Sequence, residues 1–267
     1  MALKKAYGII LWSRKQGETS KVLSVYTREF GKLHVMAKGS RGTKSKYLGS
    51  LETYYLISMV FYHKENRSMH YMSDVSLEES FPRLHQRLGK LALASVPCEI
   101  IEKSEIDEHS HPQLFQHVLD TLYALENAEK GLKNIIRSFM IKFLSFAGFE
   151  PDFSQCMFCQ KKESQSDVFF SLKHGTFACA DCRHEIEAII PLSAECLSLM
   201  RWLRQVPISR ACEARISRTA GDDVDQLLVN YMRYHIETIK KLKSLEYVKQ
   251  LESALANGTR KRTDQQA

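Results

Sequence analysis

Hydrophobic and polar residues alternate with a period of two along about the first 80 positions, as in β-strands that have one buried face. In the segment 21–27, for example, Val22, Ser24 and Tyr26 share one face and the intervening residues share the other. Turn residues such as Gly17 and the glycine-rich stretch 39–49 interrupt the alternation. The predicted strands cover 6–12, 21–27, 33–38, 54–62 and 68–75. Five short strands separated by turns predict a small, closed or nearly closed β-barrel.

After Pro82 the hydrophobic residues recur at the 3.6-residue period of amphipathic helices. Predicted helices cover about 84–106, 112–122 and 132–146, Ser193 is the expected N-cap of another, and one long helix is predicted from about 222 to 255. The sequence therefore predicts an α+β protein. Its expected parts are a β-barrel domain at 1–80, a helical domain at 81–256 and a flexible tail at 257–267.

Charge is distributed unevenly along the 267 residues. Residues 1–46 contain 11 lysines and arginines but only two acidic residues, a net charge of +9, whereas the rest of the chain carries −2. Concentrated positive charge attracts polyanions because neutralised phosphates release their counterions. We therefore expect nucleic acid as the partner; an anionic membrane surface and a merely solvated basic face are the alternatives.

The basic residues of this region fall at predicted strand ends and in the glycine-rich loop, where they suit contact with a sugar-phosphate backbone. Those expected to contact DNA are Arg14, Lys15, Arg28, Lys38, Arg41, Lys44 and Lys46. Interleaved aromatic residues could either stack on bases or fill the barrel core. The loop lacks the P-loop pattern, since Thr43 rather than lysine follows Gly42, so no nucleotide binding is expected.

Four of the seven cysteines form two Cys-x-x-Cys pairs. The pairs are Cys156 with Cys159 and Cys179 with Cys182, separated by 19 residues. This spacing is typical of structural zinc sites, because each short turn presents two thiolates to one tetrahedral ion. We expect one structural Zn²⁺ in an insertion at about 153–186, with a β-hairpin between the pairs that turns near Gly175. A thioredoxin-like redox pair is the alternative, and His174 or His184 could be a spare ligand.

The sequence contains neither a Gly-x-Ser-x-Gly nor a His-Glu-x-x-His motif, and nothing else in it demands an enzyme. There is no signal-peptide pattern and no run of about 18 uncharged apolar residues, so a cytoplasmic location without membrane contact is expected. A DNA-binding protein without catalysis is the favoured interpretation. A zinc-dependent nucleic-acid-processing enzyme and an RNA-associated barrel protein are the alternatives.

Several segments in the first third of the chain together resemble one family. They are Ala6-Tyr-Gly-Ile-Ile-Leu, Gly17-Glu-Thr-Ser-Lys-Val-Leu, Thr27-Arg-Glu-Phe-Gly-Lys-Leu, Ala37-Lys-Gly-Ser-Arg and Glu79-Ser-Phe-Pro. With the two Cys-x-x-Cys pairs, their order resembles the bacterial RecO family of DNA repair proteins, over residues 5 to about 250. The resemblance implies an N-terminal OB-fold, a helical body and an embedded zinc knuckle.

The same resemblance implies a recombination mediator that binds single- and double-stranded DNA and anneals complementary strands. Its implied partners are RecR and the tail of the single-stranded-DNA-binding protein, and it would help to load RecA at the nucleoid. The family's basic surface corresponds to Lys38 and Arg41 here. Gly42 stands where a second basic residue is frequent in the family, which implies a weaker contact by the loop.

Overall fold

The computed structural model describes residues 2–63, 68–104, 109–162, 166–185 and 189–263. The chain forms two compact units, one made of Met1–Glu126 with Leu242–Ala267 and the other of Asn127–Lys241. The predicted division after residue 80 remains a prediction. The strands of the first unit end at Glu79, and the same unit also contains the helices that follow them and the C-terminal helix.

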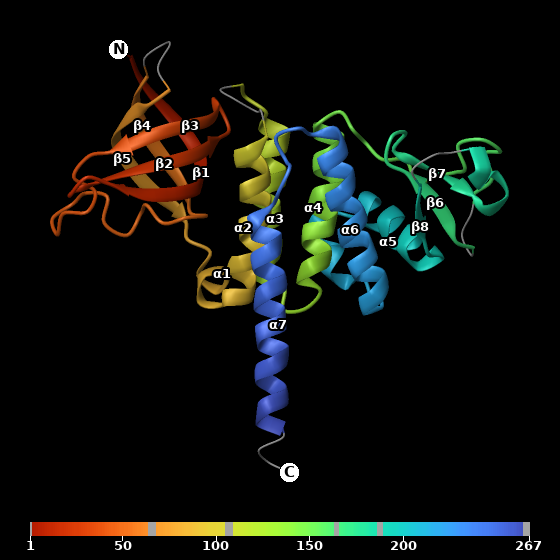
Figure 1. The fold of residues 1–267 in the computed structure, drawn as a ribbon. Coiled ribbons are helices and arrows are strands. Elements are labelled where there is room, and N and C mark those ends of the chain that lie inside the picture. Colours follow the sequence, from red (N-terminus) through yellow and green to blue (C-terminus); the bar gives the residue numbers. More distant parts are fainter. Residues whose placement is uncertain (1, 64–67, 105–108, 163–165, 186–188, 264–267) are drawn as a thin grey trace. The chain divides into compact units, whose positions relative to one another are not determined.

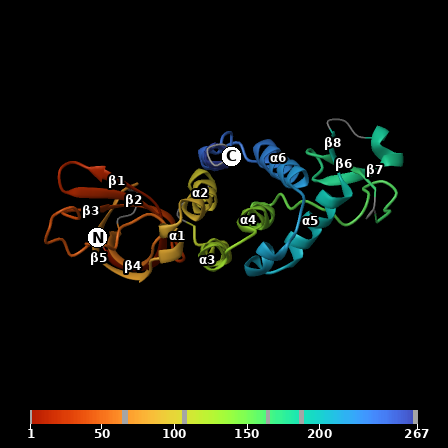
Figure 2. The same cartoon turned by 90° about the horizontal axis from the view of Figure 1, so that it is seen from below.

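The N-terminal strands close into the predicted barrel (Figures 1 and 2). They are β1 (Ala2–Gln16), β2 (Ser20–Thr27), β3 (Gly31–Ala37), β4 (Leu56–His63) and β5 (His70–Glu79). The order around the barrel is β1-β2-β3-β5-β4, and only the β3–β5 pairing is parallel among the described strands. Strand β1 is longer than predicted because its first half pairs with β4 and its second half with β2.

The alternating pattern of the sequence fills the barrel interior. In β3 every second residue is buried, and the inward side chains of all five strands form one hydrophobic cluster. Leu23, Val35 and Phe61 are among its fully buried members. Burial of such side chains contributes about 1.5–3 kcal/mol each, so the alternation is sufficient to set which face of each strand turns inward.

Helices cover the outer face of β2 and its neighbours. The first unit contains α1 (Pro82–Gln86), α2 (Leu88–Lys103), α3 (Pro112–Asn127) and α7 (Lys243–Thr263). Ser24 donates a hydrogen bond of 2.6 Å to the Glu102 carboxylate on α2, and the ring centroid of Tyr26 lies 5.9 Å from that of Phe115 on α3. The second half of β2 is therefore buried on both faces.

The second unit combines helices with a small sheet. Its elements are α4 (Leu132–Phe146), β6 (Val168–Ser171), β7 (Thr176–Cys179), the short 3-10 helix η1 (Ala180–Glu185), β8 (Ile189–Leu192), α5 (Ala194–Gln205), the 3-10 helix η2 (Ile208–Glu213) and α6 (Arg218–His235). Helix α4 has the predicted bounds, and Ser193 caps α5 as expected by accepting a hydrogen bond from the Cys196 amide. Arg137 of α4 and Asp225 of α6 form a largely buried bidentate ion pair at 2.7 and 2.9 Å.

The prediction of a single long helix from 222 to 255 is wrong. Helix α6 ends at His235 and α7 begins at Lys243. At the start of α7 the Glu99 carboxylate accepts hydrogen bonds from the amides of Lys243 and Ser244, at 3.0 and 2.7 Å. The free amides of a first helical turn need such an acceptor, and the local pattern of the sequence does not reveal one supplied by α2. The helix also continues to Thr263, past the predicted start of the tail.

Replacing Glu99 with glutamine is expected to lower the free energy of unfolding by about 0.5–2 kcal/mol, the usual contribution of a helix cap. Burial opposes the charge of Glu99, but hydrogen bonds from Ser244 and Lys243, together with the Lys103 ammonium 2.9 Å away, lower the pKa of its carboxyl. The stabilisation is therefore present above the unfolded pKa of about 4.3 and is lost as the pH falls through the folded pKa.

Urea denaturation of the wild type and the Glu99→Gln variant at a series of pH values measures this effect. The difference in stability should be full at neutral pH and should shrink in acid. Exposed Glu237 is the matched control, and Glu237→Gln should change stability by less than about 0.5 kcal/mol. If the difference in unfolding free energy between the wild type and Glu99→Gln stays constant down to acid pH, the capping role of the Glu99 carboxylate is contradicted.

Candidate metal centre and nucleic-acid interface

The four paired cysteines are held by two adjacent backbone turns of the second unit. The first pair lies in a turn that follows an isolated bridge between Cys156 and Phe177, in which the amide of Gln160 donates to the Cys156 carbonyl. Cys179 ends β7, and Cys182 follows in η1. The predicted hairpin between the pairs is formed by β6 and β7 and turns at Gly175, whose φ of +66° favours glycine.

The geometry of this cluster fits one tetrahedral metal ion. Its four sulfur atoms lie within 4.8 Å of one another, and Sγ of Cys159 lies 3.7 Å from Sγ of Cys179. A tetrahedron of thiolates around zinc, with Zn–S bonds of about 2.3 Å, has edges of about 3.8 Å. Across the described ranges, neither His174 nor His184 belongs to a metal-ligand group. The sulfur atoms therefore have the spacing of a four-thiolate centre.

Electrostatics within the cluster also favour a bound cation. Burial opposes ionisation of Cys156, but backbone amides of Cys179, Cys159 and Phe158 donate to its sulfur and lower its pKa to about 6. Desolvation and the neighbouring thiols raise the pKa of Cys182 to about 12 and also raise that of Cys179. One thiolate thus forms readily, whereas the next ones are opposed by its charge. A divalent cation removes this repulsion, because coordinated thiols are deprotonated.

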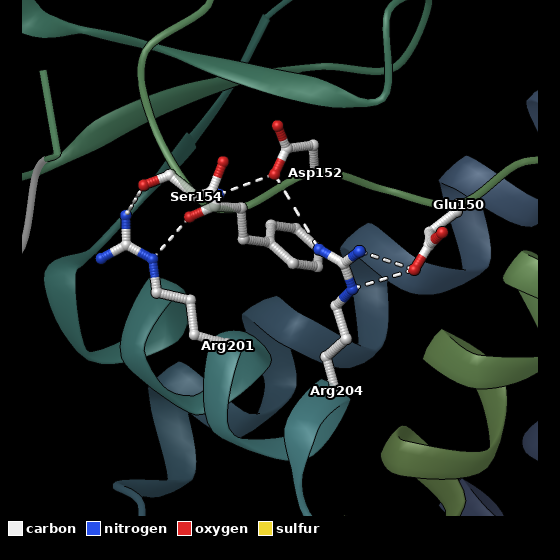
Figure 3. A network of polar contacts seen from close by, with 6 residues as sticks. Glu150, Asp152, Ser154, Arg201 and Arg204 are labelled. Carbon is white, nitrogen blue, oxygen red and sulfur yellow. Dashed lines mark hydrogen bonds and ion pairs between the residues drawn. The ribbon is translucent and has the colours of Figure 1, made fainter. Parts of the chain in front are cut away.

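Two arginines of α5 hold the segment that leads into the cysteine cluster (Figure 3). Arg201 donates to the carbonyl oxygens of Phe153 and Ser154, and Arg204 binds the Glu150 carboxylate at 2.6 Å. The Phe153 side chain is fully buried, with its ring centroid 5.7 Å from that of Phe170 in β6. The segment before the cluster is therefore anchored to α5 of its own unit.

Four of the predicted DNA-contacting residues gather at one end of the barrel. Arg14 and Lys15 lie at the end of β1, Lys38 directly follows β3, and all three are exposed. The register connects these positions, because Lys15 pairs with Lys21 and Lys21 pairs with Ala37. The Arg41 guanidinium donates to the carbonyl oxygens of Gly17 and Glu18, at 3.1 and 2.9 Å, in the turn between β1 and β2. We call Arg14, Lys15, Lys38 and Arg41 the basic end.

The other three predicted residues are placed differently. Arg28 follows the opposite end of β2, about 20 Å along the strand from Lys21, where Ser110 donates to its carbonyl oxygen. Lys46 turns toward β5, where it donates to the Ser73 carbonyl and lies 3.9 Å from the Asp74 carboxylate. Lys44 is exposed in the loop after β3. The structure therefore does not bring Arg28 together with the basic end.

The aromatic residues divide between the core and the surface. Tyr26 and Tyr47 are buried, at 0% and 6% exposure, so neither presents a face to a ligand. Trp12 is half-buried, with the Arg14 guanidinium 4.6 Å from its ring centroid. Sequence analysis missed Tyr71 of β5, whose ring centroid lies 4.5 Å from Nζ of Lys38. The alternation of residues along β5 indicates that Tyr71 faces outward, but its contact with Lys38 depends on the pairing of β5 with β3.

The fold and these two sites define a class of α+β proteins in which a β-barrel with a cationic end is joined to helices that carry a four-cysteine centre. Among the described residues, no helix is both long and apolar enough to cross a membrane. Two family models match consecutive parts of the chain: "Recombination protein O N terminal" matches residues 1–81 and "Recombination protein O C terminal" matches residues 85–246.

Curated relatives named DNA repair protein RecO match nearly the full chain. The protein of Desulfatibacillum aliphaticivorans is 28% identical over 247 residues, covering 91% of this chain and 95% of its own. That of Caldicellulosiruptor saccharolyticus is 28% identical and covers 93% and 99%. That of Thermoanaerobacter sp. (strain X514) is 24% identical and covers 95% and 100%. The chain belongs to the RecO family, which associates it with DNA repair and recombination and confirms the resemblance found in its sequence.

Proposed function

We propose that this protein is a non-enzymatic recombination mediator. It binds single- and double-stranded DNA through the barrel, anneals complementary strands and, together with RecR, assists the loading of RecA at the nucleoid in the cytoplasm. The observation that carries this proposal is the basic end, where Arg14, Lys15, Lys38 and Arg41 are presented on adjacent strands and turns. Membership of the RecO family supports it.

We infer that the barrel is an OB-fold. The support is its strand order β1-β2-β3-β5-β4, with β1 shared between both neighbours. Barrels of this type bind oligonucleotides with the face of the second and third strands, much of which α2 and α3 cover here, and with the loop between the first and second strands. In this protein Arg41 holds that loop, and Arg14 and Lys38 flank it. The positions of the cations therefore suit the loop between the first two strands, which such a fold uses for binding.

Annealing follows from neutralised charge. Two complementary strands repel each other through their phosphates, and cations held at one surface lower that repulsion while they release counterions. Contacts to phosphates are independent of sequence, so the same surface accepts single strands and duplexes. No nucleotide is needed for such a process, because base pairing itself supplies the favourable free energy.

We propose a purely structural role for the cysteine centre, as the site of one Zn²⁺. Four thiolates complete the tetrahedron and leave no open position for a catalytic water, which is what separates structural from catalytic zinc sites. A zinc-dependent nucleic-acid-processing enzyme is the alternative. Chelation discriminates the two, since it should unfold part of a structural protein but should abolish only turnover in an enzyme.

The proposal predicts annealing in the absence of nucleotide. Complementary fluorescent oligonucleotides coated with the single-stranded-DNA-binding protein should pair several-fold faster when the full-length protein is added, and rising salt should suppress the effect. A version of the coating protein without its C-terminal tail should abolish the stimulation if the tail is a partner. Annealing at the rate of the protein-free control would contradict the proposed function. Addition of RecR and RecA then tests the loading step.

A further inference from the structure

A row of apolar and aromatic side chains runs across the outside of the barrel. Leu3 of β1 pairs with Tyr62 of β4, and Tyr62 pairs with Tyr71 of β5. Residues directly opposite each other in neighbouring strands share a face, with Cβ atoms about 4.5–5.5 Å apart. Phe61 beside Tyr62 and Met72 beside Tyr71 point into the barrel core, as does Ala6 three positions after Leu3, so the alternation of each strand turns Leu3, Tyr62 and Tyr71 outward. We call these three residues the outer row.

In the outer row Leu3 and Tyr62 are exposed and Tyr71 is half-buried. Leu3 is 58% exposed and Tyr62 is 39% exposed, and both lie one residue from the end of their strands. The contrast with β2 is informative, because there the helices bury Ser24 and Tyr26 on the outer face. Neighbouring exposed aromatic residues on one face are a common sign of a binding surface.

The charges beside the outer row identify its ligand. Lys38 of the basic end sits 4.5 Å above the ring of Tyr71. Lys5 occupies the next outward position of β1 after Leu3 and is exposed. On β5, Asp74 lies three positions after Tyr71, and its carboxylate is 3.9 Å from the ammonium of Lys46. Aromatic rings between cations suit a chain that alternates flat apolar groups with negative charges.

We propose that the outer row is a base-stacking platform for single-stranded DNA, with Tyr62 and Tyr71 as the stacking residues and Leu3 at its edge. This inference rests on the proposed function and names the form of DNA that this face of the barrel selects. The basic end binds phosphates, and the strand then crosses β5 and β4 with its bases against the two rings. Single-strand binders combine a cationic track with aromatic platforms in this way.

The platform separates single strands from duplexes. In a duplex the bases are already stacked on one another and their faces are not accessible, so Tyr62 and Tyr71 contribute nothing to duplex binding. The phosphate contacts of the basic end are common to both forms. The outer row therefore supplies a preference for unpaired DNA that the charges alone do not supply.

The test is fluorescence anisotropy on the full-length protein with three probes of equal length: a thymidine oligonucleotide, an abasic oligonucleotide and a duplex. Tyr62→Leu should weaken thymidine-strand binding by about 5- to 150-fold, the range for one lost stacking contact. Binding of the abasic strand and of the duplex should be unchanged. The salt dependence should keep its slope, since no phosphate contact is removed. Tyr71→Leu should act in the same direction.

Two further variants guard against a structural effect. Tyr62→Phe retains the ring and should restore binding of the thymidine strand, whereas Tyr234→Leu removes a tyrosine that is 55% exposed on α6 and should change nothing. Thermal unfolding should be the same for all variants. An equal loss for all three probes, or no loss with the thymidine strand, would overturn the platform. Failure of the wild-type protein to bind any probe would instead contradict the proposed function.

Discussion

Replacing Arg14, Lys15 and Lys38 together with alanine should weaken binding of single-stranded DNA by about 10²–10³-fold at about 50 mM salt. It should also reduce the slope of log K against log salt by about 2, since each lost contact to a single strand removes about 0.7. These three exposed cations are preferred to Arg41, whose guanidinium also holds the turn between β1 and β2 through two carbonyl oxygens. Anisotropy titrations at several salt concentrations measure both quantities.

A matched triple variant controls for net charge. Lys162, Lys240 and Lys249 are exposed and lie outside the barrel, and their joint replacement with alanine removes the same charge. It should leave the slope nearly unchanged. Arg28→Ala tests the structural grouping, because Arg28 lies at the other end of β2 and its loss should have a small effect. An unchanged affinity and slope in the barrel variant would place the DNA site elsewhere.

Cys159→Ser should remove the metal and lower the free energy of unfolding by several kcal/mol. Structural zinc contributes about 10–16 kcal/mol in zinc-finger peptides near neutral pH, and its loss should cost less here because hydrogen bonds from Arg201 also hold the segment before the cluster. Cys159 is the suitable position because its side chain is exposed, whereas Cys156 and Cys179 are buried and a change there would also disturb packing. Metal content by mass spectrometry and thermal denaturation are the two measurements.

Cys212 supplies the control, since it is half-buried and lies outside the cluster. Cys212→Ser should retain one bound metal and nearly wild-type stability. Chelation of the wild type should reproduce the effect of Cys159→Ser, and chelation of that variant should add little. A full complement of metal in Cys159→Ser would refute the assignment of this ligand, and an unchanged stability after metal loss would show that the centre is not structural.

The clustering of the four cysteines could be predicted from the sequence because it depends on local spacing. Two cysteines separated by two residues present their thiolates from one turn, whatever the rest of the fold does. The 19 intervening residues have the length and the turn of a hairpin, and β6 and β7 form it. What the sequence could not supply is the anchoring by Arg201 and Arg204, which lie some 50 positions further along the chain.

The cations proposed to contact DNA could be listed from the sequence, but their grouping on the surface could not. Counting charges identified the cationic first 46 residues, yet Lys15 of β1 pairs with Lys21 near the start of β2, whereas Arg28 follows the opposite end of β2. Lys46 has a neighbouring carboxylate on β5 that no local pattern reveals. Strand pairing decides which charges become neighbours, and pairing joins residues that are distant in sequence.

The outer row could not be predicted from the sequence either, because it also depends on strand pairing. Alternation in β4 indicates that Tyr62 lies opposite to the core-facing Phe61, but it does not show that Tyr71 lies beside it. The break between α6 and α7 is a similar case, because the capping carboxylate of Glu99 comes from a helix about 140 residues earlier.

By itself the sequence determined the strand and helix periods, the inward faces of the strands, the four thiolates and the concentration of positive charge. These features follow from interactions within one element or one turn, where the number of residues between two positions determines how they lie in the structure. The tertiary structure alone decided the order of the strands around the barrel, the membership of the basic end, the outer row and the cap of α7. Those depend on register and packing between distant segments, which the free energy of the whole unit sets rather than any single stretch of residues.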